Sequence, residues 1–411
     1  MLSASFHKLG QIRATVTHGV RKSAGVDSGE APPSLDRPER GHRLRRFVLA
    51  LLLIVALLGF TGCKTVSFYA QAIKGQCHIL THKQDIAKLL SDPQTPAPLR
   101  ERLQLLEDLR SFAERELQLP VNGHYRQYVD LHRPYVVWNV EAAPEFSMEP
   151  KSWRYPFVGR LEYRGYFSLS GATNYARGLR TKGYDVSVGG VQAYSTLGWF
   201  KDPVLNTFLF EPDTDLAEII FHELGHQKVF ASGDEDFNEA FATTVGQEGT
   251  RRWLRAKGHS AALEAYLAHL ERNRLFVHLA MRTRARLEAL YGDQRTASGR
   301  VRAGQPNPQV PPAQLRERKE RILNEMKEEY ARMKAQWGGG PEYDGWFTHP
   351  INNAHLNSVA AYYDLVPAFE QLLSADQGNL EKFYTDAKRL ASRPKTERRQ
   401  SLSALAQRNG D

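Results

Sequence analysis

The segment His222-Glu223-Leu224-Gly225-His226 constrains this chain more than any other stretch. Apolar residues at positions 216, 219, 220, 224 and 230 recur at helical spacing, which predicts an amphipathic helix around the segment. Asp215 and Glu218 have the spacing of a capping box at its start, and the sequence Ser-Gly-Asp at 232–234 predicts its end. Because residues four apart share a helix face, His222 and His226 should point two imidazoles at one place.

Two histidines in this arrangement provide two of the three protein ligands of a tetrahedral Zn²⁺ ion, with water in the fourth position. Glu223 would lie beside the metal, where its carboxylate can take a proton from that water as general base. A second helix over 236–243 follows a short polar loop, and it should bring Glu239 back over the histidines as the third ligand.

The segment has two other possible interpretations. A metzincin would need Gly at 229 and His at 232, but the chain has Val229 and Ser232. A core helix with two unrelated histidines is the second alternative. A chance His-Glu-x-x-His occurs in roughly one chain of this length in a hundred, so the pattern favours a metal site.

These segments resemble those of the gluzincin metallopeptidases, in which two His and a downstream Glu hold zinc. More narrowly, the chain resembles a bacterial family of predicted zinc aminopeptidases that are often lipoproteins. The resemblance is carried by YAQAIKGQ (69–76), RPYVVWNVEAAPE (133–145), YRGYF (163–167), GYDVSVGGVQAYSTLGWFKDP (183–203), FHELGHQ (221–227), FNEAFAT (237–243) and INNAHLNSVAAYYDLVPAFE (351–370). It implies a peptide substrate, and it is the sole reason to expect an aminopeptidase instead of an endopeptidase.

The N-terminal residues read as an export signal. Arg43-Leu44-Arg45-Arg46 precedes a mainly apolar, uncharged run over 47–60, which is too short for a comfortable membrane span. Gly62-Cys63 then ends the run as in a lipobox, so we expect cleavage before Cys63 and a lipid on its thiol. The alternative is an uncleaved signal anchor. The protein should therefore be held at a membrane of the bacterial cell envelope, facing the periplasm.

The net charge of +9 does not indicate a nucleic-acid partner. Residues 1–62 contain nine Lys or Arg against four Asp or Glu, which accounts for about half of that charge. The rest is spread over the mature chain, and no DNA- or RNA-binding motif accompanies it. The sequence does not define an oligomeric state.

The sequence predicts an α+β, predominantly helical fold, with a zincin-like small sheet, the His-Glu-x-x-His helix and a helical C-terminal region. An N-terminal extension and lipoprotein signal peptide should cover 1–62, and a zincin-like metallopeptidase domain 63–411. Within that domain we expect a helical scaffold (64–130), the small sheet (131–210), the metal-binding helices (211–256) and a helical region (257–400) with a linker at 294–312.

Three further roles were assigned to sets of candidates. The oxyanion formed during peptide hydrolysis needs a donor, for which Tyr362 is preferred over His355 and Tyr363. An aminopeptidase needs acidic groups for the substrate's α-ammonium, and Glu145, Glu211 and Asp213 are candidates. Asn238 should orient a ligand or bind backbone. The aromatic segment 193–200 is either a substrate-binding strand edge or a loop packed into the core.

The sequence thus predicts a zinc-dependent peptidase, with aminopeptidase activity implied by resemblance. Two rivals stay open. One is a zinc endopeptidase of the cell envelope, and the other is a catalytically idle envelope lipoprotein in which zinc only braces a binding surface.

Overall fold

The structure is a computed structural model that describes residues 66–121, 123–155, 159–193, 201–298, 300–304, 310–363 and 365–407. The predicted signal peptide and Cys63 lie outside these residues. From residue 79 onward the described chain forms one compact unit, and residues 66–78 belong to another. Within the described residues, no helix combines the length and the apolar character that a membrane span requires.

The chain between residues 79 and 130 is mainly helical, as predicted, but it also contributes two short strands. Asp85 caps one helix by accepting a hydrogen bond from the Lys88 amide at 3.1 Å. Pro98 lies in the first turn of the next helix, where its missing N–H is tolerated. The elements here are β1 (Gln84–Asp85), α2 (Ile86–Ser91), α3 (Ala97–Arg115) and β2 (Gln127–Val129), and β2 pairs in parallel with the later strand β8 (Val204–Leu205).

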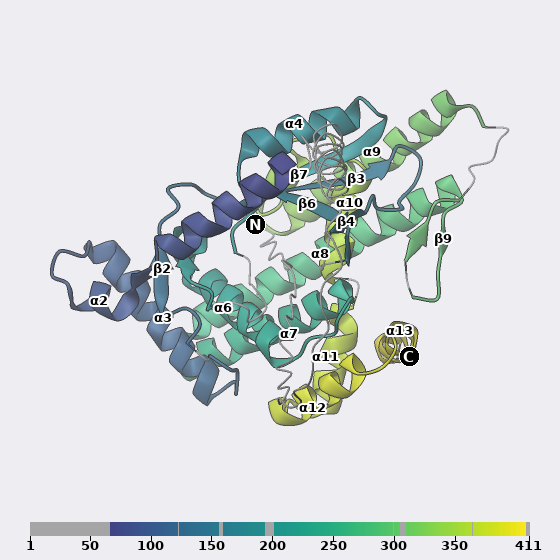
Figure 1. Cartoon of the computed structure of the whole chain (residues 1–411). Helices are drawn as coiled ribbons and strands as arrows, with labels where there is room; N and C mark the ends of the chain where they lie inside the picture. Colours follow the sequence, from purple (N-terminus) through teal and green to yellow (C-terminus); the bar gives the residue numbers. More distant parts are fainter. Residues whose placement is uncertain are drawn as a thin grey trace, which may run out of the picture. The chain divides into compact units, whose positions relative to one another are not determined.

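The small sheet is antiparallel and has the strand order β6-β3-β7. Helix α4 lies against one of its faces (Figure 1). Trp138 on β3 and Tyr166 on β6 face α4, since Tyr166 packs on Tyr175 of that helix. The elements are β3 (Val137–Pro144), β4 (Trp153–Tyr155), β5 (Gly159–Leu161), β6 (Tyr163–Tyr166), α4 (Leu169–Arg180) and β7 (Tyr184–Val191), with β4 and β5 paired separately.

Two long helices follow the sheet and lie side by side, α6 (Asp213–Lys228) and α7 (Glu235–Ala256), after the short α5 (Asn206–Leu209). The predicted capping box is wrong, because α6 begins two residues before Asp215 and has no side-chain cap. The carboxylate of Glu218 instead accepts a hydrogen bond from the Tyr266 hydroxyl at 2.6 Å. Aromatic packing of Phe237 and Phe241 on Phe369 joins α7 to the C-terminal helices.

The rest of the chain is almost entirely helical. The elements are α8 (Ser260–Tyr291), β9 (Gln294–Arg295), β10 (Val301–Arg302), α9 (Pro312–Gln336), the 3-10 helix η1 (Asp344–Phe347), α10 (Asn353–Tyr363), α11 (Val366–Ala375), α12 (Leu380–Ala391) and α13 (Lys395–Gln407). The stretch interpreted as a linker contains the antiparallel pair β9–β10. The segment after residue 352 forms two helices, α10 and α11.

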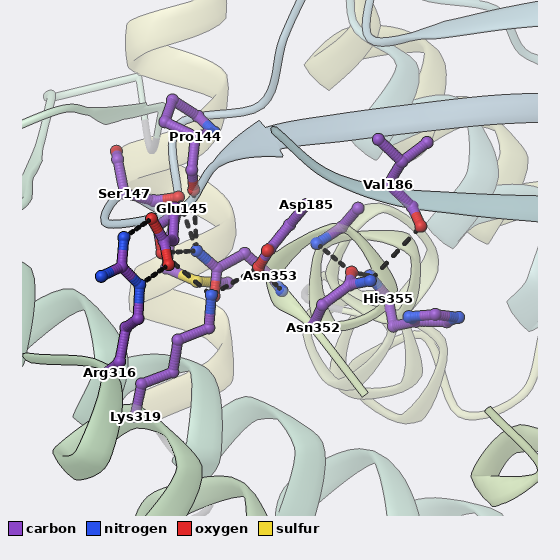
Figure 2. Close-up of polar contacts among 12 residues, drawn as sticks. Pro144, Glu145, Ser147, Asp185, Val186, Arg316, Lys319, Asn352, Asn353 and His355 are labelled. Carbon is purple, nitrogen blue, oxygen red and sulfur yellow. Dashed lines mark hydrogen bonds and ion pairs between the residues drawn. The ribbon is translucent and has the colours of Figure 1, made fainter. Parts of the chain in front are cut away.

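The start of α10 is fastened to the sheet by Asn353 (Figure 2). Its side-chain amide donates to the carbonyls of Pro144, Glu145 and Ser147 at 2.9–3.1 Å. Its backbone N–H donates to Asp185 at the start of β7, which also accepts from Lys319 of α9. Asn353 is fully buried, so this junction fixes α10 against the end of the sheet.

The fold class is therefore confirmed: an α+β, predominantly helical protein with small sheets. The boundaries of the signal peptide and of the predicted subregions stay predictions.

Candidate metal centre

Helix α6 brings His222 and His226 together, as their spacing predicts. The two Nε2 atoms lie 3.1 Å apart, and the ring planes stand at 79° to each other. Both side chains are buried: 8% of His222 and 3% of His226 are exposed. Burial on this scale is unusual for two histidines that do not share a ligand or hydrogen-bond partner.

Glu239 of α7 completes the cluster. Its carboxylate oxygens lie 3.5 Å from Nε2 of His222 and 3.7 Å from Nε2 of His226. All ligand atoms of the three residues fall within 4.8 Å of one another. A tetrahedral zinc ion with bonds of about 2.0–2.2 Å places its ligands about 3.3–3.6 Å apart, so these three residues fit such an ion.

The loop between α6 and α7 is closed by Asn238. Its side-chain oxygen accepts from the Ala231 amide at 2.7 Å, and its side-chain N–H donates to the Ala231 carbonyl at 3.0 Å. Asn238 therefore binds backbone, one of the two roles expected for it. Asn238 directly precedes Glu239 on α7, so its two hydrogen bonds to Ala231 also hold Glu239 in place relative to the loop.

Two glycines let α6 and α7 approach closely at the cluster. A Cβ at Gly246 of α7 would lie 2.9 Å from the Glu218 carbonyl oxygen and 3.2 Å from the His222 Cβ. A Cβ at Gly225 of α6 would lie 3.3 Å from the Val245 Cβ. Larger residues at these positions would push the ligand helices apart.

Burial at the cluster favours neutral histidine, the form that binds a metal ion. Burial lowers the pKa of His222, and the carboxylates of Glu223 and Glu218 only partly oppose that effect. Glu223 is 1% exposed, so a buried carboxylate lies near enough to His222 for its charge to act on that imidazole. Burial raises the pKa of Tyr125, and the charge of the nearby Glu223 carboxylate raises it further.

The three oxyanion-donor candidates have different positions. His355 packs against Trp346 at 6.0 Å, and burial, then His349 and Arg180, lower its pKa to about 4. None of those neighbours belongs to the metal cluster. Burial, and to a lesser extent the charge of Glu218 on α6, raise the pKa of Tyr363 to about 12. The side chain of Tyr362 lies outside the described part of the structure.

The three acidic candidates for an α-ammonium site all have protein partners. Arg316 binds the Glu145 carboxylate through two nitrogens, as Figure 2 shows. Arg102 pairs with Asp213, and the Gln192 amide donates to Glu211. These contacts leave little reason to assign any of the three to a ligand. Of the aromatic segment 193–200, residues 194–200 lie outside the described residues.

The sequence did not point to Tyr125, Glu141 or Tyr163. Burial raises the pKa of Tyr163, and the charges of Glu235 and Glu239 on α7 add to the rise. A signal for Glu141 does exist in the sequence. Polar Asn139 and Glu141 alternate with Trp138, Val140 and Ala142, which is the pattern of a strand with one polar face.

Comparison with curated proteins found no match, and comparison with solved structures found none either. Family models did match. Residues 67–402, which include the sheet, both ligand helices and the C-terminal helices, match the model named Putative aminopeptidase, and the chain belongs to that family.

Proposed function

We propose that the protein is a zinc-dependent aminopeptidase. The proposal is carried by one observation: His222, His226 and Glu239 converge in a buried cluster, and the charge of the buried Glu223 carboxylate acts on His222. Membership of an aminopeptidase family supports a peptidase-like activity and favours cleavage next to a free N-terminus.

In this proposal His222 and His226 would hold the ion through Nε2, and Glu239 would hold it through a carboxylate oxygen. Bound zinc supplies a Lewis acid that polarises the scissile carbonyl and favours ionisation of water. Glu223 accepts the proton of the attacking water and delivers it to the leaving amine. Asn238 keeps Glu239 in place through its contacts with Ala231.

The decisive variant is Glu223→Gln in the zinc-loaded full chain. The amide keeps the shape of the carboxylate but cannot take a proton. We expect zinc content to be unchanged and kcat/KM on an alanyl-coumarin amide to fall by about 10²- to 10⁴-fold. Glu264→Gln, an exposed change on α8, is the matched control and should keep wild-type activity. Turnover close to wild type in Glu223→Gln would contradict the role.

The two rival functions are separated by the same preparation. An internally quenched peptide with a blocked N-terminus reports an endopeptidase. If zinc copurifies with the protein but neither substrate is cleaved, the protein is the catalytically idle envelope lipoprotein. Purified protein without zinc, whose activity is indifferent to a chelator, overturns all zinc-dependent readings.

We also propose that a lipid on Cys63 anchors the enzyme in the bacterial cell envelope, facing the periplasm. The support is the basic and apolar run before Gly62-Cys63. Cys63→Ser should release the protein from the membrane fraction, and unchanged membrane retention of this variant would argue against the anchor.

A further inference from the structure

The first helix of the described chain covers residues 66–81 and has an exposed apolar stripe. In a helix, the first residue shares its face with those four, seven and eleven positions later. Here these are Val66, Ala70, Ile73 and Cys77, and all four are exposed. Val66 is 65% and Ile73 64% exposed, more than any other large apolar side chain described. Exposed apolar residues aligned in this way favour a partner surface, whereas scattered single ones do not.

The segment around this 66–77 stripe is basic and has no acid. No Asp or Glu occurs between Glu39 and Asp85, although the whole chain contains 46 of them. Lys74 and His78 are exposed and lie four residues apart on the row of the helix next to the stripe. A lysine at such a border can lay its methylene stem on apolar material and keep its ammonium among anionic headgroups. The segment therefore has the chemistry that suits the boundary of a phospholipid bilayer.

The chain before the helix ends close to the predicted membrane anchor. Val66 lies three residues after a lipid on Cys63, or six after an uncleaved apolar run over 47–60. These links span at most about 11 Å and about 20 Å when fully extended. The stripe itself rises about 17 Å along the helix axis, so the whole stripe can rest on the bilayer next to either anchor. The helix would lie along the surface, since no described helix could cross a membrane.

We propose that helix 66–81 lies in the surface of a phospholipid bilayer, with the 66–77 stripe toward the acyl chains and Lys74 among the headgroups. This inference rests on the proposed anchoring in the cell envelope and adds a second contact between the protein and the membrane. The lipid is a flexible tether, whereas a helix in the surface fixes how the residues after Cys63 meet the bilayer. The helix contact alone is weak, so the lipid is still required for stable attachment.

Cys77 gives the first test, because it is the one thiol left in the chain when Cys63 carries a lipid. The full-length lipoprotein is added to vesicles of phosphatidylethanolamine and phosphatidylglycerol, and its reaction with a membrane-impermeant maleimide is timed. The reference is Glu264→Cys, an exposed position on α8, in a Cys77→Ser background. Each rate is divided by that of the same thiol in unfolded protein. Cys77 should then react about tenfold more slowly than the reference, because the bilayer covers the stripe.

Ile73→Gln gives the second test. It should bring the Cys77 rate to within about threefold of the reference while the lipid on Cys63 keeps the protein on the vesicles. Leu169→Gln is the matched control: it changes another exposed leucine-sized side chain, 51% exposed at the start of α4, and should leave Cys77 protected. Both variants should melt at the wild-type temperature, because neither side chain is buried.

The possible outcomes separate the helix contact from the anchor. Equal rates for Cys77 and the reference, in protein that stays on the vesicles, would overturn the helix contact and leave the lipid anchor standing. Protection that persists without vesicles and grows with protein concentration would also overturn it, since a second copy of the chain would then cover the stripe. If mass spectrometry finds no lipid on Cys63 but Cys77 is protected on vesicles and Ile73→Gln removes the protection, the helix contact stands and the lipid anchor is wrong.

Discussion

Ionisation of Glu141 opposes folding, which gives a pH prediction for protein stripped of metal by a chelator. Its pKa of about 8 in the fold exceeds the 4.5 of an ordinary glutamate. The folded state therefore holds an extra proton between these values, and the free energy of unfolding falls as pH rises through that window. The contribution of this group is at most ~1.4 kcal/mol per pH unit.

Denaturant titrations at pH 5, 6 and 7 test this behaviour. Glu141→Gln should gain stability over wild type steadily across the series, because it has no proton to lose. Glu145→Gln should differ from wild type by a constant amount, since Arg316 lowers the pKa of Glu145 and the residue stays ionised throughout. A constant difference for Glu141→Gln as well would refute the assigned pKa.

At the residue scale, periodicity predicts which side chains of a single helix or strand point in the same direction. The juxtaposition of His222 with His226 follows from spacing on a single helix, and Glu239 required only one short loop. The neighbours of Glu141 depend on the register of three strands, which no local pattern encodes. For the same reason, Glu145 looked available in the sequence, whereas Arg316 lies 171 positions away.

The packing of α6 on α7 gives a prediction at the scale of elements. Gly246→Ala puts a methyl group 2.9 Å from a backbone oxygen that cannot move alone, so the two ligand helices must separate. We expect a loss of about 1–3 kcal/mol in the free energy of unfolding. Zinc affinity, measured by competition with a chromogenic chelator, should fall about tenfold, in line with disturbed ligand support.

Gly178→Ala is the control for helix propensity. Gly178 is exposed within α4, and a Cβ there meets nothing within 4 Å. Both changes replace glycine inside a helix, which should itself contribute about 1 kcal/mol of stability. Gly178→Ala should therefore stabilise the protein and leave zinc affinity unchanged. If Gly246→Ala behaved in the same way, the close approach of the helices would not matter to the site.

Most elements were predictable and their ends were not. The helices that carry His222, His226 and Glu239 and the strands of the small sheet lie where periodicity and composition place them. The predicted capping box is absent because the Glu218 side chain accepts a hydrogen bond from Tyr266 of α8. The pattern had predicted a hydrogen bond within the first turn of its own helix. The stretch 294–312 has a linker's composition, yet β9 and β10 pair within it.

At the scale of the molecule, α13 holds the start of α7 through contacts between residues that are far apart in the sequence. Arg398 of α13 pairs with Asp234, which directly precedes α7, and Lys395 adds a contact at 3.1 Å. Arg398 is 5% exposed and also donates to the carbonyls of Leu390, Ala391 and Arg393. The helix that carries Glu239 is thus anchored at its start by residues 164 positions later.

Breaking this pair should destabilise the protein strongly. Arg398→Met leaves the buried Asp234 carboxylate with Lys395 as its remaining ion-pair partner among the described residues, and loss of a buried pair costs about 3–5 kcal/mol. Arg321→Met, which breaks an exposed pair with Glu317, should change stability by less than about 1 kcal/mol. Both are measured by denaturant unfolding of the full chain.

A second substitution tells a broken ion pair from lost packing. Arg398 also lies 5.1 Å from the centre of the Phe237 ring, so Met at 398 removes packing as well as charge. Asp234→Asn in the Arg398→Met background removes the carboxylate that has lost its buried partner, and it should recover part of the lost stability. If the double variant were as unstable as Arg398→Met alone, packing around Phe237, not the ion pair, would be what α13 contributes to the metal centre.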